Sequence, residues 1–452
     1  MKTLIKNATL VNEGSEQVAD LLIENAHIER IAPVISNVHA HREIDAEGLY
    51  LLPGIIDDQV HFRQPGLTHK ATIYSEAKAA VAGGVTSFME MPNTLPPATT
   101  LQRLEEKFLI AQTTSLANYS FYLGAAKDNL EEIKRMDPQR VAGLKIFMGS
   151  STGQLVVDDD AALERIFQYC PTLIATHCET DALIQQQEAF YRQQYGDAIP
   201  IRLHADIRNA DQCKRCTEKA IDLARRFGSR LHVLHVTTAD ECPLFEAHPR
   251  LEEKQITAEV CVHHLLFCAD DYERLGPLIK CNPAIKDARH RQALWDALAE
   301  NRLDVIATDH APHTWQEKMA TTAEGKPDYF RIPSGLPLVQ HGLNIMLHFF
   351  HQGKLNLASI VEKMCHAPAR LFQIYRRGFL REGFFADLIL VDLHHEWLVS
   401  KDNLYYQCGW SPLEGMTFRG RVTHTFVNGR LVYQNGVFDE SCNGMRLLFD
   451  RN

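Results

Sequence analysis

The stretch GIIDDQVHFRQPG, residues 54–66, joins a buried-strand pattern to polar groups at its end. Apolar Ile55 and Ile56 open it, Gln59 stands near its middle, and His61 and Arg63 follow at its far end. A short apolar run that ends in polar side chains is typical of a strand whose carboxyl end carries chemistry. We therefore interpret it as the first strand of a parallel α/β sheet.

Seven more segments of this kind follow, with helical patterns between them. We expect strands at residues 55–60, 85–91, 119–123, 143–147, 173–177, 231–235, 256–260 and 304–308, and helices, among others, within 72–84, 159–170, 210–228 and 287–301. Eight strands that alternate with helices predict a (β/α)8 TIM barrel over residues 53–377. An open doubly wound sheet is the alternative, disfavoured because no glycine-rich phosphate loop follows the first strand.

Both ends of the chain have a different pattern. Residues 1–52 alternate apolar and polar residues, and so do FFADLILVDL (384–393), RVTHTFVNGRLVYQNGVF (421–438) and MRLLFD (445–450). This period of two indicates strands, and the Asn-Gly pairs at 428–429 and 435–436 suit tight hairpin turns. We expect residues 1–52 and 378–452 to form one small β-sandwich domain beside the barrel.

Composition excludes several classes of function. The net charge of −10 comes without a basic block, which argues against nucleic acid or an anionic membrane as partner. No apolar run is long enough for a membrane span, and the N-terminus lacks a signal-peptide pattern. The 11 cysteines have no paired spacing, so we expect reduced thiols in a cytoplasmic protein. Cys213 and Cys216 are interpreted as helix residues one turn apart.

Metal-capable residues recur at the ends of the predicted strands. His61 follows the first, Lys145 lies near the end of the fourth, His177 and His235 end the fifth and sixth, and Asp309 follows the eighth. A single such residue is more often a hydrogen-bonded core residue, but in a barrel these five would converge above the axis. Imidazoles with a carboxylate suit zinc, which can lower the pKa of a bound water to about 7. Asp309 could then act as general base.

Other strand ends carry groups suited to a substrate. Arg63 offers a fork of donors for a carboxylate, Asn93 can donate and accept, and His313 begins a long loop, 313–335, that could cover the barrel mouth. The alternatives are a surface ion pair for Arg63 and a turn-forming role for Asn93. His263 and His264 follow the seventh strand and would point in opposite directions if extended, so at most one would face the site. Lys145 could instead form a salt bridge with a neighbouring carboxylate.

Taken together, these motifs resemble the dihydroorotases of the amidohydrolase superfamily. The resemblance runs in order from about residue 50 to 375 through GIIDDQVHFRQPGLTHK, AAVAGGVTSFMEMPNT, AGLKIFMGSSTG, IATHCE, HVLHVTT, VCVHHLLF, CNPAIK and IATDHAPH. It implies a zinc enzyme that reversibly closes N-carbamoyl-L-aspartate to L-dihydroorotate in pyrimidine biosynthesis. Position by position, it implies metal ligands at His61, Lys145, His177, His235 and Asp309, and substrate contacts at Arg63, Asn93 and His313. Lys145 matches a lysine that related enzymes carboxylate to bridge two metals.

The chain departs from this pattern at Gln59, where the family has the first histidine of a two-histidine motif. One or two zinc ions are therefore expected, because the other ligand positions are retained. Relatives that lose several ligands act as inactive partners of aspartate transcarbamoylase, so a scaffold function stays open. Dihydropyrimidinases (hydantoinases) are disfavoured because their substrates lack the carboxylate that Arg63 would bind. Allantoinases usually have Asn-Glu-Pro-Gly at residues 63–66. We expect a homodimer acting on a small molecule.

Overall fold

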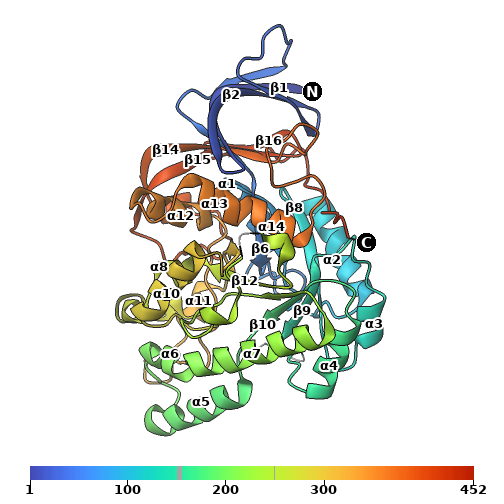
Figure 1. Ribbon diagram of the computed structural model, residues 1–452. Coiled ribbons are helices and arrows are strands. Elements are labelled where there is room, and N and C mark those ends of the chain that lie inside the picture. Colours follow the sequence, from blue (N-terminus) through green and yellow to red (C-terminus); the bar gives the residue numbers. More distant parts are fainter. Residues whose placement is uncertain (150–154, 249, 452) are drawn as a thin grey trace.

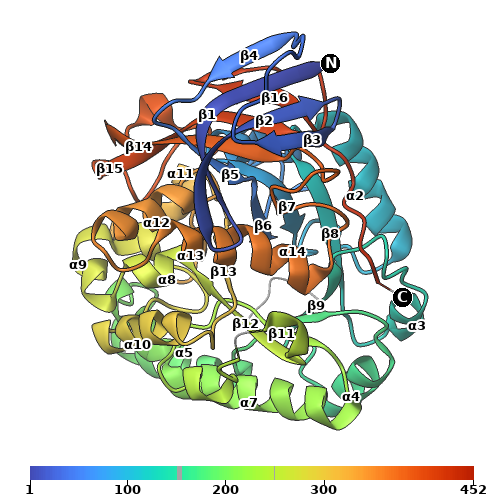
Figure 2. The same ribbon diagram turned by 45° about the horizontal axis from the view of Figure 1, so that its top comes forward.

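A computed structural model describes residues 1–149, 155–248 and 250–451 of the chain. Eight parallel strands pair in sequence order: β6 (Ile55–Val60), β7 (Val85–Glu90), β8 (Asn118–Gly124), β9 (Gly143–Phe147), β10 (Ile174–His177), β11 (Leu231–Val233), β12 (Ile256–Cys261) and β13 (Val305–Ala307). The sheet curls until its ends meet, where Val60 bridges to His310 and the His61 N–H donates to the His310 carbonyl at 2.7 Å. The predicted (β/α)8 barrel is confirmed (Figure 2).

Helices surround the barrel (Figure 1). They are α1 (Ile73–Ala82), α2 (Leu101–Thr114), α3 (Leu130–Lys134), α4 (Asp160–Tyr169), α5 (Asp181–Tyr195), α6 (His204–Ile207), α7 (Ala210–Phe227), α8 (Val262–Leu266), α9 (Tyr272–Leu275), α10 (Ala288–Ala299), α11 (Trp315–Lys318), α12 (Gly342–His351), α13 (Leu357–Val361) and α14 (Ala367–Phe372). The four segments that were expected to be helical contain α1, α4, α7 and α10, in that order. Cys213 and Cys216 lie on the buried face of α7, as predicted.

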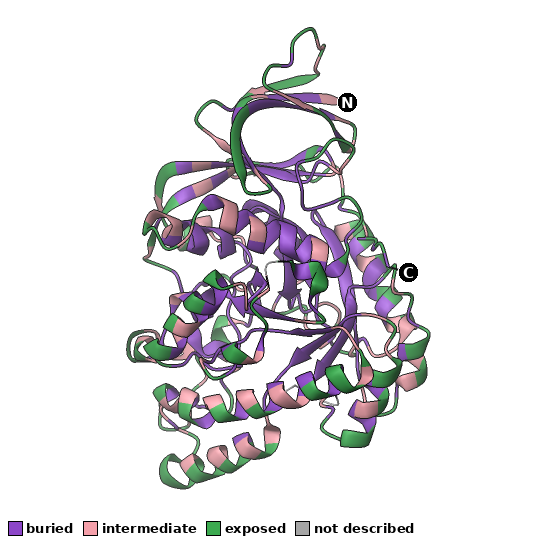
Figure 3. Ribbon diagram, in the orientation of Figure 1, coloured by how far each residue is buried: buried purple, intermediate pink, exposed green. Residues whose placement is uncertain are grey.

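Burial follows the pattern read from the sequence. The barrel strands are buried almost throughout, whereas the outer helices alternate buried and exposed faces (Figure 3). Local chemistry sets the helix ends: the Thr72 hydroxyl accepts the Ser75 N–H at the start of α1, and Gly228, at φ 72°, ends α7. None of the described helices combines the length and apolar composition that a membrane span requires.

The two ends of the chain form a second, nine-stranded sheet. It contains β1 (Lys2–Asn12), β2 (Ser15–Glu24), β3 (His27–Ala32), β4 (Arg42–Asp45), β5 (Tyr50–Pro53), β14 (Leu388–Leu398), β15 (Thr417–Val427), β16 (Arg430–Gln434) and β17 (Val437–Phe438). The N- and C-terminal halves join where β5 pairs antiparallel with β14. Asn428 and Gly429, both with positive φ, form the tight turn between β15 and β16. In Figure 1, β1 and β2 arch over β14 and β15, giving the two layers of the expected sandwich.

The strand expected at residues 445–450 is not part of this sheet. Instead the tail returns to the barrel, where the Tyr119 N–H donates to the Met445 carbonyl and the Leu447 N–H donates to the Tyr119 carbonyl. Buried Arg451 then donates to the carbonyls of Phe372 and Ala142. The alternating pattern was read correctly as extended, but its partner is β8 of the barrel.

The Arg451 contacts predict a stability effect. Arg451→Met leaves several buried carbonyls without donors and should lower the free energy of unfolding by about 2–4 kcal/mol. Urea unfolding followed by circular dichroism measures this, with exposed Arg30→Met as the control. Equal stability of the two variants would show that the tail does not hold the barrel.

Candidate active site

All eight residues predicted to form the site line one cavity of about 340 Å³ at the carboxyl ends of the barrel strands. They are His61, Arg63, Asn93, Lys145, His177, His235, Asp309 and His313. Gln59 lines the same cavity, and so do residues 329, 330 and 332–335 of the loop that begins at His313. The structure thus brings together groups that lie up to 252 positions apart, from His61 to His313.

Three of these residues leave the strand conformation abruptly. Arg63, His235 and Asp309 have φ values of 69°, 39° and 45°, in the left-handed region that non-glycine residues rarely occupy. His235 was expected to end a strand over 231–235, but β11 ends at Val233 because of this change. Such conformations cost about 1–3 kcal/mol each and persist where surrounding contacts hold them.

His177 and His235 present nitrogen atoms to each other. The Nε2–H of His177 donates to Glu179 Oε2 at 3.0 Å, which leaves its Nδ1 with a lone pair 2.9 Å from His235 Nε2. Arg208 also donates to Glu179 and, against the effect of burial, helps lower the pKa of that carboxyl to about 2. Burial keeps the pKa of His235 well below its usual value, so this imidazole is neutral. Neutral, oriented imidazoles are the form that binds a metal.

The second half of the site centres on Asp309. His61 Nε2 and Gln59 Nε2 lie 3.1 and 3.2 Å from Asp309 Oδ1, and His61 Nδ1 lies 2.7 Å from the Asn93 amide oxygen. Burial raises the pKa of Asp309, but the hydrogen bond and charge of His61 outweigh it, so the net pKa is lowered. The carboxylate is therefore ionised at neutral pH.

Lys145 is buried between these two halves, with a side chain 1% exposed. Burial lowers its pKa to about 8, although the charges of Asp309 and Glu259 act in the opposite direction. The salt bridge considered from the sequence does not form: within the described residues Lys145 has no ion pair, and its Nζ lies 4.6 Å from the ring centre of Phe147. An amine in this state is available to become an anionic ligand. With the imidazoles and Asp309 it completes a donor set that fits zinc.

Basic side chains also line the cavity. Arg63 Nε donates to the Pro312 carbonyl at 3.0 Å, and its Nη2 lies 3.0 Å from His313 Nε2. Burial lowers the pKa of Arg63 to about 10, so it stays charged at neutral pH. Lys280 donates to two loop carbonyls, those of Tyr329 and Ile332. Burial lowers the pKa of Lys280 to about 7, so this amine is only partly charged at neutral pH. Over the described ranges, neither Arg63 nor Lys280 forms an ion pair with a carboxylate.

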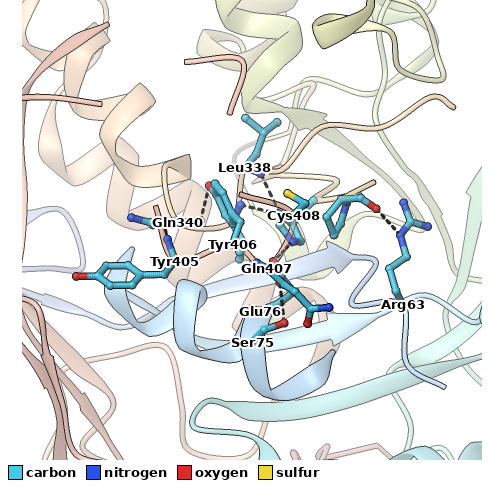
Figure 4. Close-up of polar contacts among 12 residues, drawn as sticks. Arg63, Ser75, Glu76, Leu338, Gln340, Tyr405, Tyr406, Gln407 and Cys408 are labelled. Carbon is cyan, nitrogen blue, oxygen red and sulfur yellow. Dashed lines mark hydrogen bonds and ion pairs between the residues drawn. The ribbon is translucent and has the colours of Figure 1, made fainter. Parts of the chain in front are cut away.

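A buried network behind the cavity was not predicted. His310 Nε2 donates to Glu76 Oε2 at 2.8 Å, and His310 Nδ1 accepts the Leu338 N–H at 2.9 Å. Glu76 Oε1 in turn accepts the Ser75 hydroxyl and the Gln407 N–H (Figure 4). The network holds His310, the residue that follows Asp309, in place. The only sign of this network in the sequence was a glutamate among the apolar residues of α1.

Neither His263 nor His264 is among the residues that line the cavity, in keeping with the prediction that at most one of them would face the site. They are not extended but lie in the first turn of α8, so their rings stay together with centroids 4.0 Å apart. Helical residues one position apart diverge by about 100° rather than 180°. Both side chains are buried.

An eight-stranded barrel with metal-capable residues at its strand ends and a sheet built from both termini defines a class of metal-dependent hydrolases. The profile of the amidohydrolase family matches residues 50–432. The chain is 32% identical to an allantoinase of Deinococcus radiodurans, with 99% of both chains covered. It is 31% identical to a dihydroorotase of Methanosarcina acetivorans, covering 91% of this chain and 88% of the relative.

A solved structure has the same fold. An L-hydantoinase (dihydropyrimidinase) from Arthrobacter aurescens superposes with a TM-score of 0.90 at 30% identity, with 97% of each chain covered. The chain therefore belongs to the amidohydrolase family, whose members are generally metal-dependent, and it is a hydrolase of cyclic amides. Three substrate specificities occur among relatives of similar identity, so the substrate must be argued from the cavity.

The Glu76 network predicts a loss of activity. Glu76→Gln removes the charge that holds His310 and should lower the rate of cyclic amide hydrolysis about 10- to 100-fold. Exposed Glu106→Gln, on α2, is the matched control. Steady-state kinetics on both variants, after a melting curve shows that they are folded, make the comparison; full activity of Glu76→Gln would remove the network from the site.

Proposed function

We propose that the chain is a zinc-dependent dihydroorotase, which interconverts N-carbamoyl-L-aspartate and L-dihydroorotate in pyrimidine biosynthesis. The observation that carries the proposal is Arg63: a buried, charged guanidinium at the cavity wall with no carboxylate partner among the described residues. A buried unpaired charge is costly, and a substrate carboxylate would satisfy it with two parallel hydrogen bonds. Hydantoin, dihydrouracil and allantoin carry no carboxylate.

The other cavity residues support the same substrate. His313, next to Arg63, is kept neutral because burial holds its pKa well below the usual value, so it can donate or accept without adding charge. Asn93 beside His61 offers an amide to the carboxylate or the ring. Lys280 adds a second basic group near the loop, with its pKa lowered by burial to about 7; a carboxylate freed by ring opening that lies there would favour the protonated amine.

The proposed chemistry divides between two sets of residues. His61, Lys145, His177, His235 and Asp309 would hold the zinc, which when bound supplies electrophilic activation of the amide carbonyl and of water. Asp309 accepts a proton in the hydrolytic direction and returns it to the departing ring nitrogen. In synthesis the same carboxylate takes the proton from the ureido nitrogen. Arg63 and Asn93 hold the substrate so that its two reacting groups stay in contact.

We also propose that Lys145 carries a carbamate. Its lowered pKa leaves about a tenth as free amine at pH 7, far more than for an exposed lysine, and only the free amine adds CO2. When the amine nitrogen bonds the carbon of CO2 and releases a proton to solvent, a buried group that was mostly a cation becomes an anion. The free thiols of all eleven cysteines are consistent with a cytoplasmic enzyme.

Substrate choice is tested with L-dihydroorotate, dihydrouracil, hydantoin and allantoin. We expect turnover of L-dihydroorotate alone, and a 10²- to 10³-fold loss of kcat/KM in Arg63→Met because a buried charge pair is lost in the complex. Arg135→Met, exposed on the far side of α3, is the control. Turnover of allantoin or dihydrouracil without dihydroorotate would refute the proposal, and zinc-loaded protein inactive on all four would favour the transcarbamoylase scaffold.

A substitution at Gln59 tests how many zinc ions each chain binds. Its amide donates to Asp309, whereas an imidazole would offer a stronger ligand atom at the same place. Gln59→His should therefore raise the zinc bound per chain, measured by elemental analysis after dialysis. Exposed Gln102→His controls for a histidine added elsewhere. Unchanged stoichiometry would mean that Gln59 does not limit the site.

A further inference from the structure

A second group of metal-capable side chains lies where β12 meets α8. Cys261 ends β12, and His263 and His264 lie in the first turn of α8. One ligand atom of each lies within 4.8 Å of the other two, and all three side chains are buried. None of them has a role in the chemistry proposed above.

The histidines are oriented like ligands. His264 Nε2 donates to the Pro283 carbonyl at 3.1 Å, so in the neutral ring the lone pair belongs to Nδ1. Among the described residues that Nδ1 has no hydrogen-bond partner, and neither nitrogen of His263 meets one in good geometry, although, against the effect of burial, the Thr308 backbone is near enough to raise the pKa of the His263 ring. Burial lowers the pKa of His263 to about 4, so both rings are neutral at physiological pH. Buried polar atoms without partners cost desolvation energy that a bound ligand would recover.

Cys261 lies next to Gln59, the residue of the first barrel strand at which the chain departs from the family pattern. Its Sγ lies 3.4 Å from Glu259 Oε1 and 3.8 Å from Gln59 Oε1. The side chain at the position where the resemblance implies a histidine is therefore next to a thiol. Burial, with the charges of Glu259 and Asp309, raises the pKa of the Cys261 thiol well above its usual value, so the thiol keeps its proton until a metal displaces it.

We propose that Cys261, His263 and His264 bind a thiophilic divalent cation of the Zn²⁺ class. This site is additional to the metal set described above and does not depend on it. On binding, the Cys261 thiol loses its proton to solvent and its sulfur forms the metal–thiolate bond, while His263 and His264 contribute neutral nitrogen lone pairs. One thiolate and two imidazoles are a ligand set that zinc accepts, with a fourth position left open.

Tetrahedral binding of a metal requires a small movement of the three ligand side chains. Zinc–sulfur and zinc–nitrogen bonds of about 2.3 and 2.0–2.1 Å place tetrahedral ligands about 3.3–3.6 Å apart. The three ligand atoms lie within 4.8 Å of one another, so the side chains need to move together by at most roughly an ångström.

Cobalt gives a readout that the other metal set cannot produce, because that set contains no cysteine. The full-length protein is stripped with a chelator and titrated with Co²⁺ while its near-ultraviolet absorption is recorded. Wild type should develop a thiolate-to-cobalt charge-transfer band, and Cys261→Ser should lose that band together with one equivalent of bound cobalt.

Cys281→Ser is the matched control, because Cys281 Sγ lies 3.9 Å from His264 on its Nε2 side and is equally buried. The control should keep the band, and His264→Asn should weaken it. Absence of the band in wild type, or its persistence in Cys261→Ser, would overturn the proposal. Either result would leave the substrate panel and the zinc content of the other set unaffected, so the two proposals fail separately.

Discussion

A lysine buried at the end of β9, without a carboxylate partner among the described residues, is the constraint on which the rest of the site depends. Removing an ammonium group from water is costly, and the charges of Asp309 and Glu259 offset only part of that cost. The barrel places Lys145 between a pair of imidazoles on one side and Asp309 with His61 on the other. Only an arrangement that neutralises or inverts the lysine charge makes this position favourable.

The surrounding groups divide the cavity electrostatically. The imidazoles of His177 and His235 have lowered pKa values because they are buried, so they act as neutral donors of lone pairs. Arg63, in contrast, keeps its charge at neutral pH. Neutral ligands around one point and a cation elsewhere in the same cavity are what a substrate needs when one end carries a reacting amide and the other a carboxylate. Rigid supports, Glu179 behind His177 and Glu76 behind His310, hold both sides in place.

Much of this architecture could be predicted from the sequence, because each barrel strand is a short apolar run with its functional residue at the end. The strand boundaries agree to within one or two residues, and the eight predicted site residues share one cavity. The supports could not be predicted, since Glu76 and His310 are 234 positions apart and nothing in the sequence pairs a helix residue with the residue that follows Asp309. The turn of α8 was missed because five residues are too few for a helical period, and the tail from residue 445 because periodicity does not identify a strand's partner.

The most direct test of the account is the chemical state of Lys145. The zinc-loaded protein, equilibrated with ¹³C-bicarbonate, should show a carbamate carbon by NMR that is bound to the protein and absent from Lys145→Met. Intact mass measured under native conditions should be higher than that of the variant by one CO2 minus the amount by which a methionine residue outweighs a lysine residue. A spectrum without this carbon, from protein that contains zinc and turns over dihydroorotate, would contradict the account, because Lys145 would then be a simple buried amine.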